Sequence, residues 1–330
     1  MKRPAVVTSI LAAAVLGSST IAAPLAADVF TVTTLADSGP GSLRQAVADA
    51  VSGDQIRFAV GGTILLTTGE IVIDKDLTIR GPEAASVAVR RDVGAFGRIF
   101  SIDGATVSIS RLSIENGIVF CCLDGEVGGG IFNDGVLRLA SVTLSDNTAP
   151  IGGAVYNAPG ARLDVINSTL SGNLASDPGF GCDGGGFGGG IGNDGGDVSL
   201  RNTTISDNEG PCGGGIYQSG GRVTVVNTII DEGQFSSPAC EIDGGVVDSA
   251  GHNLDSDGTC GLGHPRDLPG LDPVLGPLAD NGGPTLTHAL LGGSPALDAG
   301  SLASAPPDDQ RGVPRPQGPR VDVGAFELVP

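Results

Sequence analysis

The chain has 330 residues, of which 55 are glycine and 21 proline; 40% are hydrophobic, and the formal charge is −19. The apolar content excludes a disordered chain, and the clustered glycines exclude collagen, which needs glycine at every third position. With only two lysines, this acidic chain lacks the cations that neutralise nucleic-acid phosphates, so we expect no nucleic-acid partner.

Residues 1–27 have the build of a secretory signal peptide: a basic start, an apolar stretch over 5–16 and small residues over 22–27. The apolar stretch is too short for a stable membrane span, and no later segment is apolar enough to cross a bilayer. We therefore expect a protein that is secreted or displayed on the outer cell surface, with the periplasm as the alternative. In an exported chain, cysteines favour disulfides over metal ligands; the six are Cys121, Cys122, Cys182, Cys212, Cys240 and Cys260.

An amphipathic helix is predicted over 42–52, before the first strands. Ser42 is a suitable N-cap and Gly53 ends the pattern, with Leu43, Ala46, Val47 and Ala50 on one face. We expect this helix to cover the N-terminal end of the fold. The segments 56–60, 70–81 and 98–104 are predicted to form the strands of the first coils.

An internal repeat follows, with segments that align at 137–147, 163–173, 198–208 and 223–233. In each segment apolar residues alternate along a strand, a bend follows, and a second strand begins. The bend carries Asn167, Asn202 and Asn227 at equivalent positions, where we expect inward side-chain amides to bond to their equivalents in the next coil.

A third block, rich in glycine, recurs at 128–133, 152–157, 188–193 and 213–218. The longest glycine run, at 182–196, matches neither a phosphate-binding loop nor a calcium-binding nonapeptide repeat, so we interpret it as the crowded entry to a third strand. Three strands per coil predict an all-β, parallel β-helix over 28–254. An irregular, proline-rich cap at 255–330 is expected to wrap on the last coil.

Several segments resemble known families. Residues 32–50 are similar to the N-terminal region of CSLREA-type proteins, and residues 251–262, 272–300 and 309–327 resemble the closing region of choice-of-anchor Q proteins. The glycine blocks and the LSDN-type repeats are similar to those of polymorphic outer membrane proteins.

This resemblance implies a secreted or surface-exposed right-handed parallel β-helix with a pectin lyase-like fold. It implies no established enzymatic activity. Relatives often continue into an anchoring tail, whereas this sequence stops at Pro330, which favours free secretion or periplasmic residence.

Two disulfides are expected. The loops before the third strands emerge from one edge, so we predict a Cys182–Cys212 bridge between adjacent coils and a local Cys240–Cys260 bridge near the cap. The two remaining cysteines, Cys121 and Cys122, are expected either to form a disulfide with one another or to be reactive thiols.

An aromatic strip is predicted at the outward position of the third strand, formed by Phe132, Tyr156 and Tyr217 and interrupted by Gly192. Aligned rings stack well on sugars, so one hypothesis is a glycan-binding strip. The alternative is that the rings only cover the surface of the fold.

An enzymatic alternative places acids on the same face. Asp134 and Asp194 follow their glycine blocks two coils apart, roughly 10 Å from one another, which is slightly beyond the separation of an inverting glycosidase pair. Arg138, Arg162 and Asp183 would neutralise charge in a polysaccharide lyase. Both aspartates are also common turn residues.

Loop carboxylates supply a further alternative, a calcium site, and the residues are Asp124, Glu126, Asp177 and Asp183. A solvated acidic loop is the competing interpretation. The tail residues Asp298, Asp309, Arg311, Asp322 and Glu327 are expected to form ion pairs and turns.

Together, these features predict a monomeric, non-enzymatic, exported scaffold that has no cofactor and that is adhesive or glycan-binding. A polysaccharide lyase or glycoside hydrolase is the alternative.

Overall fold

A computed structural model describes residues 27–83, 85–120, 127–176, 186–231 and 237–330, together with Met1. The expected signal peptide at 1–27 therefore lies almost entirely outside the described residues, and it stays a prediction.

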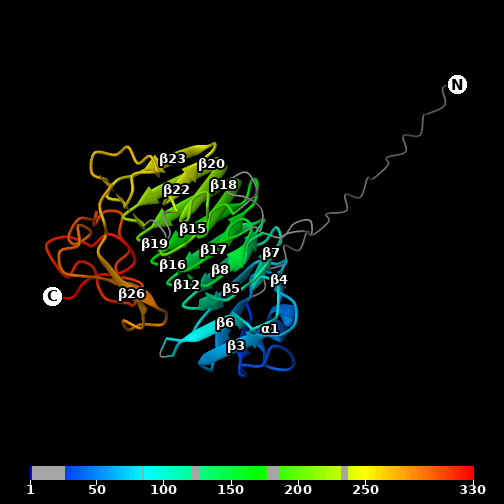
Figure 1. The fold of residues 1–330 in the computed structure, drawn as a ribbon. Helices are drawn as coiled ribbons and strands as arrows, with labels where there is room; N and C mark the ends of the chain where they lie inside the picture. The colour runs from blue at the N-terminus through cyan, green and yellow to red at the C-terminus, as the bar shows by residue number, and fades with distance from the viewer. Residues whose placement is uncertain (2–26, 84, 121–126, 177–185, 232–236) are drawn as a thin grey trace.

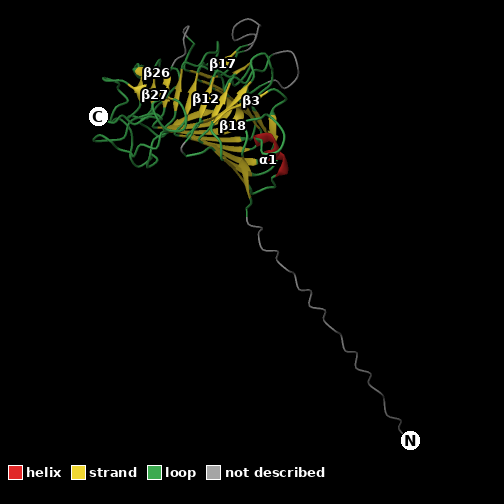
Figure 2. Cartoon of the chain, turned by 90° about the horizontal axis from the view of Figure 1, so that it is seen from below, coloured by secondary structure: helices red, strands yellow, loops and turns green. Residues whose placement is uncertain are grey.

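The chain winds into a right-handed parallel β-helix of about eight coils, as predicted (Figure 1). Each full coil contributes a first, a second and a third strand. The first and third strands belong to one 14-stranded sheet, and the second strands form a 9-stranded sheet. The view in Figure 2 shows these strands stacked in parallel rows.

The first strands are β1 (Val29–Val32), β2 (Gln55–Phe58), β5 (Leu77–Arg80), β8 (Thr106–Ser110), β11 (Val136–Ala140), β15 (Arg162–Ile166), β18 (Ile191–Arg201), β20 (Ile216–Val226) and β23 (Val246–Ser249). The second strands are β3 (Gly62–Leu66), β6 (Val87–Arg91), β9 (Ser113–Glu115), β12 (Thr143–Ser145), β16 (Thr169–Ser171), β19 (Thr204–Ser206), β21 (Ile229–Ile230), β24 (Leu254–Asp255) and β25 (Leu268–Pro269). The third strands are β4 (Ile71–Ile73), β7 (Phe100–Ile102), β10 (Ile131–Asn133), β14 (Val155–Asn157), the first parts of β18 and β20, and β22 (Cys240–Ile242).

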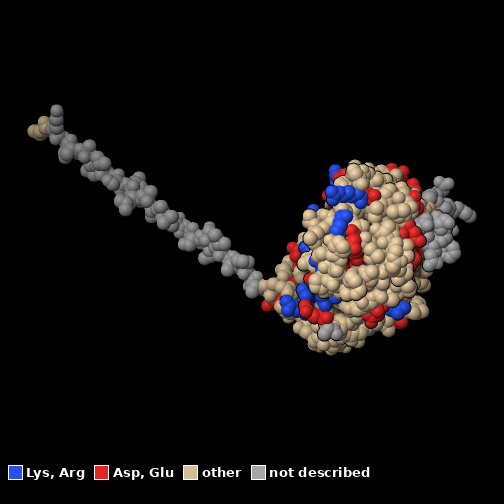
Figure 3. Space-filling model, turned by 90° about the vertical axis from the view of Figure 1, so that its left-hand side faces the viewer, with Lys and Arg blue, Asp and Glu red and all other residues tan. Residues whose placement is uncertain are grey.

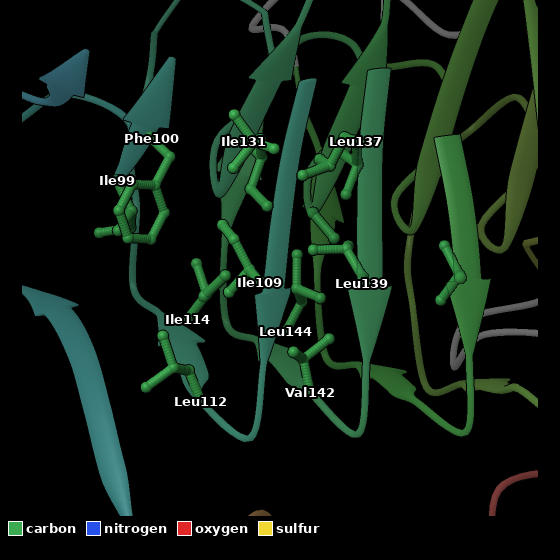
Figure 4. Close-up of a cluster of buried hydrophobic side chains, with 14 of the residues drawn as sticks. Ile99, Phe100, Ile109, Leu112, Ile114, Ile131, Leu137, Leu139, Val142 and Leu144 are labelled. Atoms are coloured by element: carbon green, nitrogen blue, oxygen red, sulfur yellow. The ribbon is translucent and has the colours of Figure 1, made fainter. Parts of the chain in front are cut away.

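Inward side chains form continuous apolar files across the coils. Leu137 pairs in register with Leu163, which pairs with Val198, and all three are buried. Figure 4 shows Ile131, Leu139 and Leu144 directed into the interior from their respective strands. The core is thus a stack of matched aliphatic side chains, as the alternation in the repeats predicts.

The bend between the first and second strands has a fixed backbone conformation. Left-handed φ angles of 53°, 46°, 48° and 50° occur at Ser141, Asn167, Asn202 and Asn227, and asparagine adopts such angles more readily than most residues. The predicted vertical file is confirmed by strand register, since Ile166 pairs with Arg201, one residue before each asparagine.

The expected bonding of these asparagines to their equivalents is confirmed between Asn202 and Asn227, but Asn167 bonds to the C-terminal region in place of Asn202. The amide of Asn167 donates to the carbonyl of Asp308 at 2.7 Å, and that of Asn227 donates to Ser301 at 2.9 Å. The Asn227 amide also donates to the side-chain oxygen of its equivalent Asn202 at 3.1 Å. The amides turn outward because the C-terminal region lies against this bend and offers backbone carbonyls.

Two buried amide ladders occur at the other two corners of the coil. Each consists of side chains that donate to the next coil at 2.7–2.9 Å: one runs through Asn147, Asn173 and Asn208, and the other through Asn133, Asn157, Asn193 and Gln218. These amides satisfy one another inside the fold, which stabilises the stacking of coils.

The glycine blocks permit close approach of the third strands. A Cβ on Gly190 would lie 2.5 Å from the carbonyl oxygen of Gly215 in the next coil, although Gly190 has an ordinary backbone conformation. The glycine run is therefore the entry to a third strand, as predicted. Glycine is needed there for space.

The predicted N-terminal helix is confirmed as α1 (Leu43–Asp49), but it ends three residues early. The Ser42 side chain accepts from the backbone N–H of Gln45, and Ala50 is the C-cap in an extended conformation. Gly53 therefore does not end the helix. The predicted apolar face is buried against the first coils.

The C-terminal region differs from the expected end cap. Residues 255–270 close the last coil, but the remainder runs back along the outer side of the second strands towards the earlier coils, and β26 (Leu275–Ala279) lies beside β12 (Figures 1 and 2). The C-terminal region contains an antiparallel hairpin of β26 and β27 (Thr287–Leu290). A separate two-stranded parallel sheet, β13 (Thr148–Ala149) and β17 (Leu174–Ala175), belongs to the coils themselves.

Hydroxyl side chains on the second strands hold this C-terminal region in place. Gln310 accepts from Thr169 at 2.7 Å and donates to Thr143 at 3.1 Å. The backbone N–H of Ala325 donates to Thr204 at 3.0 Å. The threonines and serines of the repeat thus serve as docking partners for a segment more than 100 residues away in sequence.

The tail motif organises this region through buried charge, as expected. Arg315 and Glu327 form a fully buried ion pair at 2.9 Å, and Arg311 pairs with Asp309 at 2.7 Å. Burial lowers the pKa of Arg315 and raises that of Glu327, while each partner's charge opposes the shift.

Candidate functional site

The predicted Cys240–Cys260 disulfide is confirmed, and it joins the third strand of the last full coil to the segment that closes it. Cys212 is buried next to Phe187 in a β-bridge. The predicted partner Cys182 lies outside the described residues, as do the cysteines at 121 and 122, so those pairings stay predictions.

The aromatic strip has the predicted register. Phe132 pairs with Tyr156, which pairs with Gly192, which pairs with Tyr217. These residues project from what we call the third-strand face, the outer side of β10, β14, β18 and β20. All three rings are half-buried.

Stacking on neighbouring coils covers much of the Phe132 ring. The rings of Phe132 and Tyr156 lie nearly parallel, with centroids 5.8 Å apart, and the guanidinium of Arg98 lies 5.3 Å from the Phe132 centroid.

The predicted interruption at Gly192 is filled by another residue. A Cβ at Gly192 would lie 2.7 Å from Cγ2 of Ile151, so the isoleucine of the preceding coil occupies that place. One coil further on, Phe187 packs on Tyr217 with centroids 4.6 Å apart. The strip is thus a continuous apolar surface, and sequence reasoning missed Ile151 and Phe187 because they precede the glycine blocks.

Each tyrosine hydroxyl is tied to an acid of a following coil. Tyr156 donates to Asp194 at 2.9 Å, and Tyr217 donates to Asp243 at 3.4 Å. Burial raises the pKa of Tyr156, and its bond to the Asp194 carboxylate raises it further. Tyr156 therefore stays protonated at neutral pH and is poorly suited to act as a base.

Both candidate catalytic acids directly follow the glycine-block residues, as predicted: Asp134 comes just after β10, and Asp194 lies within β18 at an irregularity in its pairing with β20. Asp134 and Asp194 are both exposed and lie two coils apart, on either side of the coil of β14. Asp194 also accepts from the Ser219 hydroxyl at 2.7 Å. The Asp194 carboxylate is therefore held in place by two hydroxyls, those of Tyr156 and Ser219, from which it accepts hydrogen bonds.

The arginines expected beside these acids project from a different surface. Arg138 and Arg162 lie on the first-strand face, which we define as the outer side of β2, β5, β8, β11, β15, β18, β20 and β23. Arg162 makes two hydrogen bonds to Asp164, at 3.0 and 3.1 Å. Asp183, the third expected helper, lies outside the described residues.

The four residues of the calcium alternative, Asp124, Glu126, Asp177 and Asp183, also lie outside the described residues. Within the described ranges, no group of three or more His, Cys, Asp or Glu side chains is placed to hold a metal ion.

Two adjoining hollows on the first-strand face were not foreseen. One has a volume of about 400 Å³ and is lined by Thr78, Ser108, Arg138 and Asp164, among others. The second, of about 220 Å³, shares Asp164 and extends to Arg162, Ser199 and Arg222. We call the two together the axial groove, because they follow one another along the stacking direction.

No protein-family model matches this chain, and no curated protein matches its sequence. In the described part of the chain, no helix has the length and apolar character needed to cross a membrane. Figure 3 shows the side that carries the C-terminal region, where acidic and basic atoms are interspersed among a larger uncharged area.

Proposed function

We propose that this protein is an exported β-helix scaffold that binds glycans, as an adhesin-like component of the cell surface or the extracellular medium. The observation that carries the proposal is the continuous apolar strip formed by Tyr156, Ile151, Phe187 and Tyr217, bordered by Asp194 and Asp243. Aromatic platforms beside hydrogen-bonding carboxylates suit sugars, which present both C–H faces and hydroxyls.

Two further features support this assignment. The Cys240–Cys260 disulfide fits an oxidising compartment, in agreement with the signal peptide expected at 1–27. The resemblance of 272–300 and 309–327 to choice-of-anchor Q proteins also favours a surface or secreted protein.

A polysaccharide lyase or glycoside hydrolase on the third-strand face is the second candidate, favoured by the positioned carboxylate of Asp194. Its partner Asp134 lies two coils away, and the tyrosine between them stays protonated. An assay for new reducing ends and for unsaturated products on neutral and acidic polysaccharides tests this candidate. Turnover that is lost in Asp194→Asn would establish it in place of the binding scaffold.

The binding proposal is tested on a glycan array with the wild type and the double variant Tyr156→Ala, Tyr217→Ala. We expect the wild type to bind at least one extended glycan and the double variant to lose that binding. Arg90→Gln, an exposed outward residue of β6, serves as the control. Binding that survives removal of both rings would refute the role of the strip.

A further inference from the structure

The axial groove is a second binding surface, and we propose that it holds a linear anionic polysaccharide whose carboxylate or sulfate groups contact its arginines. This inference rests on the proposed glycan-binding function and adds the charge class of the ligand. It concerns the first-strand face, whereas the aromatic strip lies on the third-strand face.

Arginine is concentrated on this face. Six of the chain's 16 arginines occupy outward positions on the first strands: Arg57, Arg80, Arg138, Arg162, Arg201 and Arg222. Five carboxylates lie on this face or line its hollows, at Asp76, Glu83, Asp164, Asp197 and Asp248. The balance of six arginines minus five carboxylates is +1, against −19 for the whole chain.

The carboxylates do not occupy all of these arginines. Arg162 is paired with Asp164, and Arg222 with Asp248. Arg138 is exposed in the larger hollow, and it forms no ion pair with any described residue. Its guanidinium is therefore available to a ligand, and its planar fork matches carboxylate and sulfate oxygens.

Arg57 and Arg80 provide a second cationic position. They lie opposite one another in register on β2 and β5, and they line a further hollow of about 440 Å³. Like charges directly opposite on neighbouring strands are destabilising. Arg80 is paired with Glu83, whereas the Arg57 guanidinium donates to the Gln55 side chain and forms no ion pair with any residue that the structure describes. An anion at this position would relieve the repulsion between the two guanidinium groups.

The spacing favours a polymer over a small anion. Arg80 and Arg138 lie two coils apart and two residues apart along their strands, which separates their backbones by roughly 12 Å. The axial groove spans the strands from β5 to β20, a distance of roughly 24 Å. Hydroxyls of Thr78, Ser108 and Ser199 along it would bond to sugar hydroxyls between the charged groups.

The test measures binding of polygalacturonate, dextran sulfate and uncharged dextran to the mature protein by isothermal titration calorimetry. We expect one or both anionic polymers to bind and dextran not to bind, with affinity falling as salt rises. Polygalacturonate and dextran sulfate distinguish carboxylate from sulfate recognition. Single-stranded DNA of equal charge is included, because equal binding to it would indicate a general response to polyanions and would overturn the proposal.

The variants are Arg138→Gln and the double change Arg57→Gln, Arg80→Gln, with Arg90→Gln as the control from the opposite sheet. All these side chains are exposed, so the variants are expected to fold, and thermal unfolding checks this. Arg138→Gln in the axial groove and the double change in the Arg57–Arg80 hollow should each weaken binding by about tenfold or more. This is the loss expected when a charge-assisted hydrogen bond to a bound anion is removed. Arg138→Lys should restore part of the affinity by restoring the charge.

Two outcomes separate this inference from the proposed function. If Tyr156→Ala with Tyr217→Ala abolishes glycan binding while the groove variants leave it unchanged, the inference is wrong and the glycan-binding function stands. If no glycan of any charge binds the wild type, both are wrong.

Discussion

The side-chain amide of Asn147 donates to the side-chain oxygen of Asn173 in the next coil at 2.9 Å, and both side chains are fully buried. The same Asn173 oxygen accepts from the backbone N–H of Asn147, and its amide donates to Asn208. Each member of this ladder thus satisfies groups on two neighbours, so removing one member leaves buried donors and acceptors unpaired on both sides.

Asn173→Ala is expected to lower the free energy of unfolding by at least about 2 kcal/mol, the cost of leaving buried polar groups without partners. Chemical denaturation followed by circular dichroism measures the change. Thr78→Ala, at an exposed outward position of β5, serves as the control and should stay within about 0.5 kcal/mol of the wild type. Equal stability of the two variants would show that the ladder contributes little.

Gly190→Ala is expected to destabilise the fold by about 2 to 3 kcal/mol, because the added Cβ would overlap the carbonyl oxygen of Gly215. Gly292→Ala is the matched control, since its backbone conformation is ordinary and no atom lies within 4 Å of a Cβ there. That variant should be neutral or slightly more stable, through a less flexible unfolded chain. Thermal unfolding of both variants decides the point, and a tolerated Gly190→Ala would mean that the coils separate easily.

Asp255 lies at an inward position in the last coil, in register with Ile230, and it is fully buried. Burial raises its pKa to about 6, and the nearby Asp257 carboxylate raises it too, while the N–H of Cys260 opposes the shift. The folded state therefore binds more protons than the unfolded state between about pH 4 and 6, and stability from this group is present below that window and lost as pH rises through it.

Asp255→Asn should remove the fall in folding stability that ionisation of Asp255 causes as the pH rises. Relative to the wild type, the variant is expected to gain stability when the pH is raised from 4 to 7, as measured by denaturation at both values. Asp280→Asn, which removes an exposed carboxylate, controls for the change in net charge. A difference between Asp255→Asn and wild type that is the same at both pH values would contradict the assigned shift.

Loss of the Cys240–Cys260 bridge should lower stability by about 3 kcal/mol, since it closes a loop with a sequence separation of 20 residues. Replacing both cysteines with alanine avoids a free thiol, and calorimetry measures the fall in melting temperature. The wild type under reducing conditions should fall by at least as much. A double variant as stable as the oxidised wild type would argue against any constraint from this bridge.

The repeat itself could be predicted from sequence, because it depends on local rules. Alternating apolar residues, an asparagine at a left-handed bend and a glycine block each recur at fixed places, so the register of Leu137 with Leu163 follows from alignment alone. The α1 N-cap at Ser42 was equally local. The end of α1 at Asp49 could not be predicted in this way, because it depends on the extended backbone at Ala50, from which the chain continues towards β2.

The remaining features depend on contacts between distant segments. Nothing in the repeat indicates that Asn167 bonds to Asp308, since that requires knowing where the C-terminal region lies. The place of Ile151 over Gly192 depends on how far one coil is offset from the next. Arg138 and Arg162 were grouped with Asp134 although they belong to first strands, and the corner between the third and first strands directs their outward side chains to another face.

The docking of the C-terminal region along the second strands affects how the solenoid unfolds. In most repeat folds each coil touches only its neighbours, so the ends can unwind separately. Here Gln310 contacts both Thr143 and Thr169, which belong to different coils, and Ala325 reaches Thr204 in a third. These ties should make the middle coils melt together as one unit. Because the tying segment follows the coils in sequence, those coils reach their full cooperativity only after that segment has been synthesised.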